Sequence, residues 1–297
     1  MRRIRTYKDV AAEAGAAVVT IPGQVMAQRE RLARRLADIG AVAAIASGKG
    51  GVGKSALTAN LAVSLGAHGL RVGALDSDLN GPSLARMLGV VGARFTAGEN
   101  GMIPPTGSGG IRVVSMELFQ DGADDPLRWR GPKGESWAWR GVIETGTIRE
   151  LLSDVAWGKL DVLFVDVAPG TDRIARLLDL VPDPAALLLV TTPSAMARRV
   201  VARSLRLARE ARVRRIGLVE NMTTWTCPGC GARTELYESS EPQLASREIE
   251  CWAEVPFDPR LARSTDEGTP FVLAYPDAPA ARAIGALATR LRRELHL

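Results

Sequence analysis

The sequence contains little histidine, cysteine and aromatic residue, and it has no long apolar run. No stretch approaches the ~18 apolar residues that a membrane helix needs, and the basic start Met1-Arg2-Arg3 is not followed by the apolar core of a signal peptide. We therefore expect a cytoplasmic protein without a membrane partner. In a reducing compartment, three cysteines argue for metal or redox use rather than for structural disulfides.

Charge and composition narrow the partners further. The formal net charge is +5, and the excess is spread over arginines rather than gathered with aromatic residues, so no nucleic-acid partner is expected. Apolar residues make up 46% of the 297 residues. This is enough for a substantial core in one large or two modest domains.

The stretch over residues 41–62 predicts a nucleotide phosphate site. Residues 41–47 are a short apolar run typical of a buried parallel strand, and residues 48–55 match G-x-x-x-x-G-K-[ST] before a helix-forming segment. Glycines let backbone N–H groups approach phosphate oxygens, and the helix directs its positive end at the same anion. Lys54 would reach the outer phosphates, and the Ser55 hydroxyl would bind Mg²⁺. The predicted nucleotide-binding residues here are Gly48, Gly50, Gly51, Val52, Gly53, Lys54, Ser55 and Ala56.

A dinucleotide site is the competing interpretation. The same glycines satisfy G-x-G-x-x-G, and Asp76 follows near the ~20-residue distance that this fingerprint expects. A nicotinamide oxidoreductase is therefore an alternative. Lys54 and Ser55 favour the phosphate loop, because a dinucleotide site needs neither of them. A second strand that ends in an aspartate, Asp166, favours it as well.

Apolar strands alternate with helices along most of the chain. This alternation predicts a doubly wound α/β fold with a mainly parallel sheet and helices on both faces. Residues 92–110 are expected to form a hairpin or loop excursion. Residues 121–139, which hold tryptophans at 129, 137 and 139, are expected to be irregular. The expected strands are 70–75, 111–116, 160–166, 186–191 and 216–219, and the expected helices are 147–155 and 194–211.

We expect a basic N-terminal extension, 1–38, before a nucleotide-binding domain at 39–297 that includes a C-x-x-C segment at 222–250. Residues 9–17 are expected to be helical, and Pro22-Gly23 to break that helix. Residues 25–39 keep the spacing of an amphipathic helix docked on the core with a solvated basic face. An RNA-binding arm is the less favoured alternative.

Three aspartates follow predicted strands, at the edge where parallel strands end together. Asp76 and Asp78 follow the strand at 70–75, and one of them could orient or deprotonate a water molecule; a helix N-cap and turn is the structural alternative. Asp166 ends the strand at 160–166 and is followed by a turn that contains Gly170. This suits Mg²⁺ coordination, direct or through water, and a loop that senses the terminal phosphate.

Cys227 and Cys230 form a C-x-x-C in a turn shaped by proline and glycine. A closed zinc or iron–sulfur site needs about four ligands, and the two histidines, His68 and His296, are not placed to supply the others. A second copy of the chain would complete the site around a two-fold axis. A redox pair and an inert turn remain alternatives. Cys251 is interpreted as a small buried hydrophobe rather than a ligand.

Together these motifs resemble the Mrp/ApbC family of P-loop ATPases, which are iron–sulfur cluster carriers of the MinD-like SIMIBI class, related to the nitrogenase iron protein. The resemblance runs from about residue 41 to 290. The residues that carry it are 48–55, 76–83, 129–132, 166–171, 219–222 and 227–230. The chain departs from the family at the second switch, where Ala168 replaces a proline and Asp172 follows Thr171 directly.

The resemblance implies roles for individual residues. Lys49 would be the additional lysine of the deviant phosphate loop, which reaches the partner's phosphates across a dimer interface. Asp78 would position the attacking water, so Lys49, Lys54 and Asp78 are the catalytic candidates. Asn221 would read adenine, and the stretch around Pro256 would close over the base. No Asn-Lys-x-Asp guanine motif is visible, which agrees with ATP.

The resemblance also implies a function. It predicts an ATP-binding, slowly hydrolysing homodimer that holds a [4Fe–4S] cluster on Cys227 and Cys230 and transfers it to apo iron–sulfur proteins. The alternative is a zinc-bridged dimeric ATPase of the MinD/ParA kind that acts as a targeting or positioning switch.

Overall fold

A computed structural model of the chain describes residues 21–119, 137–237 and 249–297. The expected helix at 9–17 and the tryptophan-containing segment at 129–132 lie outside these residues. So does part of the expected C-x-x-C segment, 238–248.

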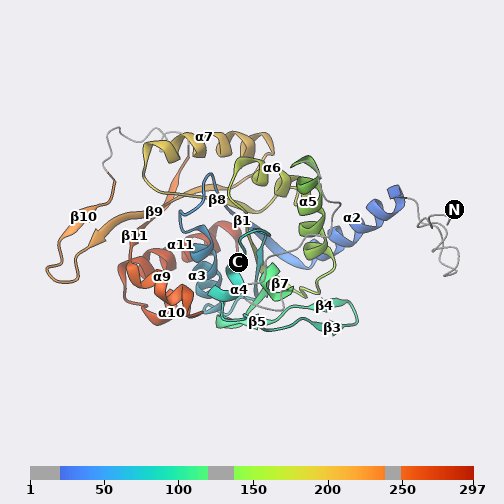
Figure 1. Cartoon of the computed structure of the whole chain (residues 1–297), viewed down its shortest axis with the longest axis horizontal. Coiled ribbons are helices and arrows are strands. Elements are labelled where there is room, and N and C mark those ends of the chain that lie inside the picture. Colours follow the sequence, from blue (N-terminus) through green and yellow to red (C-terminus); the bar gives the residue numbers. More distant parts are fainter. Residues whose placement is uncertain (1–20, 120–136, 238–248) are drawn as a thin grey trace, which may run out of the picture.

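A mostly parallel sheet forms the centre of the molecule (Figure 1). Within the described residues it has nine strands in the order β10-β9-β8-β1-β7-β2-β6-β5, with β11 also paired to β9. Its pairs are parallel except β5–β6 and β9–β10. β3 (Thr96–Gly98) and β4 (Gly101–Ile103) form a separate hairpin, as expected for 92–110. The strands of the sheet are β1 (Ile39–Ser47), β2 (Val72–Asp76), β5 (Thr106–Gly107), β6 (Ile111–Val114), β7 (Leu160–Asp166), β8 (Ala186–Thr191), β9 (Ile216–Thr226), β10 (Arg233–Glu235) and β11 (Cys251–Phe257).

Strand β1 illustrates why both faces of the sheet are covered. Ala41, Ala43 and Ile45 belong to one apolar cluster, whereas Val42 and Ala44 belong to the other. An extended strand points successive side chains to opposite faces, so a continuous apolar run needs helices on both sides.

Helices supply this cover (Figure 1). One face carries α3 (Lys54–Gly66), α4 (Leu84–Met87), α9 (Pro259–Asp266), α10 (Phe271–Ala274) and α11 (Pro279–Leu295). The other face carries α2 (Ile21–Ala37), α5 (Trp137–Ser153), α6 (Thr171–Leu180) and α7 (Ala195–Glu210). Two 3-10 turns, Ser108–Gly110 and Met116–Phe119, flank β6. The doubly wound α/β fold is confirmed. None of the described helices combines the length and apolarity needed to cross a bilayer.

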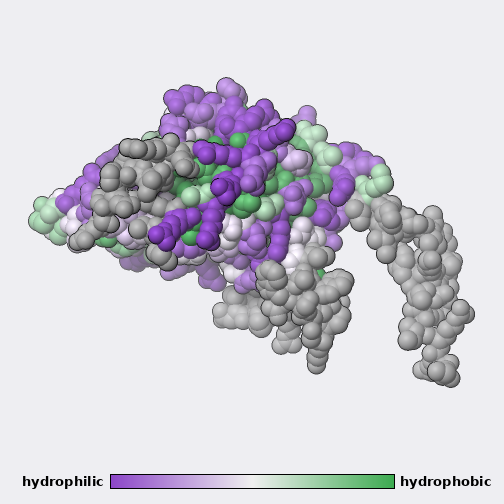
Figure 2. Space-filling model, turned by 90° about the horizontal axis from the view of Figure 1, so that it is seen from above, coloured by the Kyte–Doolittle hydropathy of each residue, from purple (hydrophilic) through white to green (hydrophobic). Residues whose placement is uncertain are grey.

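Helix α7 agrees with the expected segment 194–211. Val201, Leu205 and Ala208 are buried, whereas Arg199 and Arg203 are exposed. Figure 2, which looks down on the molecule from the α7 side, shows hydrophilic side chains over this helix. The helix therefore buries one face against the sheet and exposes a basic face to solvent.

Helix α2 packs against α5. Leu32 is buried in the apolar cluster on this face, and Arg31 forms an ion pair with Asp154 over 3.3 Å. The helix begins at Ile21, so Pro22 lies in its first turn, where a proline is tolerated.

Helix α5 is longer than expected. It begins at Trp137, whereas the sequence predicts a start at residue 147. The prediction is too short because Gly141 and Gly146 interrupt the apolar pattern that marks a helix. Gly141 leaves room for α6, since a Cβ at this position would come within 2.8 Å of the Arg176 guanidinium. Packing between helices therefore outweighs the low helix propensity of glycine here.

Strand β9 is also longer than the expected 216–219. Its pairing with β8 ends at Glu220, Met222 takes a left-handed φ of 59°, and pairing with β10 begins at Thr224. The second half of β9 thus extends beyond β8 and projects with β10 as a hairpin (Figure 1).

Close packing between β9 and β11 gives a test of the fold. Gly217 lies against the Trp252 ring, and a side-chain carbon at Gly217 would overlap that ring. We expect Gly217→Ala to lower the free energy of unfolding by about 1–3 kcal/mol, the usual cost of overpacking, in urea unfolding followed by circular dichroism.

Gly285→Ala on α11 is the matched control, because a Cβ there would meet nothing within 4 Å. This change should be neutral or stabilising by up to about 1 kcal/mol. Equal unfolding free energies for Gly217→Ala and the wild type would contradict the described β9–β11 packing.

Candidate functional site

The candidate nucleotide site lies where neighbouring parallel strands end. Residues 48–53 connect β1 to α3, which is the arrangement of strand, loop and helix that the sequence predicts. Asp76 and Asp166 are in-register partners at the ends of β2 and β7. The sheet thereby gathers residues from three separate parts of the chain at one edge.

Two glycines of the phosphate loop have left-handed backbone conformations. The φ angle is 77° at Gly51 and 82° at Gly53, values that other residues rarely adopt. Gly53 also lies against Asn221 of β9, and a side-chain carbon at Gly53 would overlap the Asn221 amide. The Asn221 Nδ2 donates to the Val52 carbonyl oxygen over 2.8 Å. The end of the loop, just before α3, is therefore tied to β9.

Three side chains of α3 converge on Asp166. The Lys54 Nζ lies 2.7 Å from Asp166 Oδ1, Ser55 donates to Oδ2 over 2.5 Å, and Thr58 donates to Oδ1 over 2.8 Å. Asp166 is fully buried, and these partners offset the cost of removing its charge from water. The Ser55 hydroxyl and the Asp166 carboxylate supply the oxygen ligands that Mg²⁺ prefers. The sequence does not predict Thr58, since a threonine inside a helix carries no motif signal.

Asp76 is buried too, but the backbone occupies its carboxylate. Oδ2 accepts the N–H groups of Ser83 (2.7 Å) and Leu84 (3.0 Å) at the start of α4. Burial, and then the nearby charge of Asp166, raises the pKa of Asp76 to about 7. The cap and turn alternative therefore fits Asp76, whereas Asp78 is partly exposed beside it.

The first half of the phosphate loop faces α7 and solvent. Lys49 is exposed, and its carbonyl oxygen accepts the Ser47 hydroxyl over 3.0 Å. Gly48 lies against Val200 of α7, and a side-chain carbon at Gly48 would overlap Val200. Ala56 is buried in the first turn of α3. Helix α7 thus borders the loop, while Lys49 remains accessible.

Pro256 lies near both Asn221 and the cysteine turn. It follows Val255, the in-register partner of Asn221 in the β9–β11 ladder. It also lines an open groove of about 440 Å³ that extends to Pro228. The groove therefore connects the stretch predicted to close over the base with the C-x-x-C.

Cys227 and Cys230 lie in the turn between β9 and β10. The Gly231 N–H donates to the Cys227 carbonyl oxygen and the Cys227 N–H to the Ala232 carbonyl oxygen, each over 2.9 Å. Backbone N–H groups of Cys230 and then Gly229 bond to the Cys227 sulfur and lower the pKa of its thiol. Cys230 is exposed and Cys227 partly exposed. The turn therefore presents a thiol of lowered pKa near the protein surface.

Cys251 is remote from this pair. Its partner in the β9–β11 ladder is Leu218, which precedes Cys227 by nine residues. Nine residues of extended chain span on the order of 30 Å, and this is the approximate separation of Cys251 from Cys227. Its sulfur and the carboxylates of Glu220 and Glu254 lie within 4.8 Å of one another. Burial, followed by these two charges, raises the pKa of the Cys251 thiol to about 11. The thiol stays protonated at neutral pH and cannot complete a site at the C-x-x-C of its own chain.

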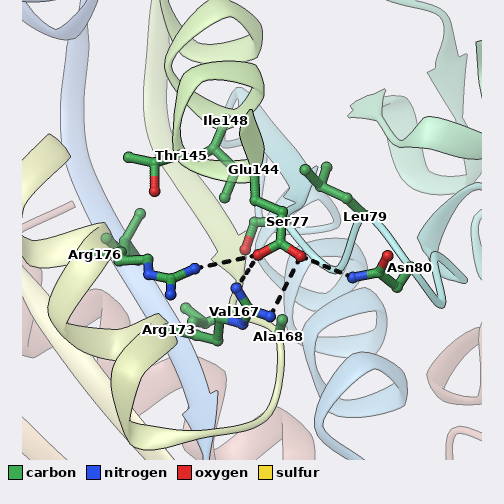
Figure 3. Close-up of a pocket in the computed structure, with 11 residues that line it drawn as sticks. Ser77, Leu79, Asn80, Glu144, Thr145, Ile148, Val167, Ala168, Arg173 and Arg176 are labelled. Atoms are coloured by element: carbon green, nitrogen blue, oxygen red, sulfur yellow. Dashed lines mark hydrogen bonds and ion pairs between the residues drawn. The ribbon is translucent and has the colours of Figure 1, made fainter. Parts of the chain in front are cut away.

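A shielded ion-pair cluster, which the sequence does not predict, lies beside the candidate site (Figure 3). Glu144 of α5 accepts hydrogen bonds from Asn80 and from Arg173 and Arg176 of α6. The Glu144 side chain is 13% exposed. Glutamate on a helix is usually a surface residue, so no sequence pattern marks this one.

Known proteins share this organisation. The ParA-group family described as the NUBPL iron-transfer P-loop NTPase matches residues 38–292. The chain is 36% identical over 262 residues to the iron–sulfur cluster carrier protein of Saccharolobus solfataricus, which covers 87% of this chain and 85% of that protein. It is 36% identical over 266 residues to the cytosolic Fe–S cluster assembly factor NUBP2 of Bos taurus, with coverage of 87% and 94%.

Solved structures agree with these relatives. A nucleotide-binding protein in complex with ADP from Archaeoglobus fulgidus superposes with a TM-score of 0.68 and 32% identity, over 85% of this chain and 98% of that one. The cell division ATPase MinD of Pyrococcus furiosus has a TM-score of 0.56 at 23% identity, over 86% and 99%, and shows the shared fold alone. The family match spans the phosphate loop, Asp166 and the C-x-x-C. The chain therefore belongs to the NUBPL iron-transfer P-loop NTPases of the ParA group.

Proposed function

We propose that the protein is a homodimeric carrier that binds and slowly hydrolyses ATP, holds a [4Fe–4S] cluster between two copies of the chain, and passes it to apo iron–sulfur proteins. The names of its relatives support a carrier of iron–sulfur clusters. The zinc-bridged positioning switch has less support, because the likeness to MinD is one of fold.

One observation carries the proposal: a single strand, β9, contacts the phosphate loop and also leads to the cysteine turn. Asn221 of β9 holds the phosphate loop through Val52, and the same strand ends beside Cys227. β11 pairs with β9 on both sides of the bend at Met222, at Asn221 and at Trp225, so a shift of the loop on nucleotide binding would be passed to the cysteine turn. Nucleotide state and thiol position are then linked within one chain.

At the nucleotide, each predicted residue has a distinct task. The N–H groups of the phosphate loop and Lys54 would bind the phosphates, and Ser55 and Asp166 would hold Mg²⁺ directly or through water. The metal would neutralise charge on the outer phosphates. Asp78 would orient the attacking water. Asn221 and the stretch around Pro256 would hold the adenine.

Two chains would complete the cluster site. Cys227 and Cys230 supply two thiolates, whereas a cluster needs about four ligands, and Cys251 lies too far away to contribute. Two copies related by a two-fold axis supply four. The exposed Lys49 is free to reach the phosphates of the partner subunit, which would make nucleotide binding and dimerisation depend on each other.

Replacing Lys54 tests the phosphate site. Lys54→Ala removes a charged hydrogen-bond donor, which contributes about 1.5–3 kcal/mol, so the dissociation constant for ATP should rise about ten- to a hundredfold in equilibrium titration. Lys159→Ala is the control, since Lys159 is exposed just before β7, at the opposite edge of the sheet. Unchanged ATP affinity in Lys54→Ala would contradict the assignment.

Replacing the cysteines tests the cluster site. After anaerobic reconstitution, wild-type protein should hold about four irons per dimer, and the Cys227→Ser, Cys230→Ser variant should hold almost none, measured by iron analysis and absorption. Cys251→Ser should load like the wild type. Full loading of the double variant, or tightly bound zinc in protein purified without oxygen, would overturn the proposal.

The thiols should also differ in reactivity. In metal-free, reduced protein at pH 7, iodoacetamide should label Cys227 well before Cys251, because the thiolate is the reactive form. Labelling of Cys251 should accelerate about tenfold per pH unit between pH 7 and 10, below its pKa, while labelling of Cys227 levels off at lower pH. Peptide mass spectrometry after timed exposure measures both rates. Faster labelling of Cys251 at pH 7 would contradict the described turn.

A further inference from the structure

Three segments of the chain meet at the carboxylate of Glu144 (Figure 3). Its oxygens accept hydrogen bonds from Asn80 (3.1 Å) and Arg176 (3.2 Å). Arg173 donates to both carboxylate oxygens. The Glu144 side chain is 13% exposed and each arginine side chain 27%. Shielding from water strengthens such contacts relative to those of surface ion pairs.

The partners of Glu144 come from two segments beside the phosphate site. Asn80 lies in the loop after β2, two residues beyond Asp78. The two arginines lie in the first two turns of α6, directly after the loop that starts at Asp166. One side chain of α5 therefore touches both the segment of the predicted water-positioning residue and the segment that follows the predicted Mg²⁺ ligand.

The ion-pair cluster around Glu144 is closely packed. Gly141, one turn before Glu144, makes room for Arg176, whose guanidinium would lie 2.8 Å from a Cβ at that position. The hollow beside the cluster has a volume of about 20 Å³, space for a single water molecule. It is too small for a metabolite, so the cluster joins parts of the chain and is not a ligand site.

A second carboxylate, that of Asp172, also balances the charges of Arg173 and Arg176. Asp172 lies 3.7 Å from Arg173 and 3.5 Å from Arg176, and it is 52% exposed. The arginines thus have a second carboxylate at the surface. What Glu144 adds is the hydrogen bond to Asn80, which connects α6 to the loop after β2.

We propose that Glu144 is a positioning residue that makes the loop after β2 and the start of α6 move as one unit during nucleotide hydrolysis. The inference rests on the proposed function, because it uses the roles given there to Asp78 and Asp166. Glu144 acts through Asn80 and the two arginines. Asp78 then reaches its working position when α6 is in place. Hydrolysis slows when the contacts of Glu144 with Asn80 and the arginines are broken.

Steady-state ATP hydrolysis by the full chain tests the proposal. Glu144→Gln should lower kcat at least fivefold, while KM and the affinity for fluorescent ADP stay within about twofold of the wild type. A merely structural role would change binding and thermal stability together. Glu150 is an exposed glutamate on the same helix, so Glu150→Gln is the matched control. It should leave kcat, KM, the affinity for ADP and the thermal stability unchanged.

A double-mutant cycle separates coupling from independent effects. Asn80→Ala alone should lower kcat as Glu144→Gln does, and the double variant should be no slower than Glu144→Gln. Wild-type kcat in either single variant, or two losses that multiply, would overturn the proposal. Asn80 is exposed, so Asn80→Ala decides the matter even if Glu144→Gln fails to fold. Wild-type protein that neither binds nor hydrolyses ATP would instead overturn the proposed function, and this inference with it.

Discussion

The site depends on one buried carboxylate, that of Asp166. It ends a central strand, is fully buried, and receives Lys54, Ser55 and Thr58 from the first two turns of α3. Losing these partners would leave an uncompensated charge in the interior, at a cost of several kcal/mol. The contact therefore holds β7 and α3 in one relative position. Since the phosphate loop connects β1 to α3, its shape follows from the same constraint.

The second constraint is the length of β9. A strand of the usual kind would end where its neighbour β8 ends, at Glu220. Pairing with β11 on one edge and β10 on the other carries it on to Thr226, past a bend at Met222. This extension places Cys227 outside the sheet, where a second chain can approach it. It also keeps Cys227 connected to the phosphate loop by continuous backbone.

The parts of this structure that follow from short-range patterns are the parts that the sequence predicts. Apolar runs such as 160–166 reveal strands buried on both faces, and the phosphate loop and the C-x-x-C are local motifs. The start of α5 and the end of β9 depend on contacts with distant segments, namely Arg176 near Gly141 and the ladder between β9 and β10. Thr58 and Glu144 are missed for the same reason, because their partners lie more than 25 residues away in sequence.

Helix α5 is held from two sides, and this has an evolutionary consequence. On one side Glu144 meets α6, and on the other α2 contributes Arg31 to Asp154, while the Arg35 Nε donates to the Ser153 carbonyl oxygen over 3.1 Å. A substitution in α2 can therefore displace the helix that carries Glu144. With the role proposed for Glu144, selection for nucleotide turnover then also acts on residues of α2, which lie far from the nucleotide.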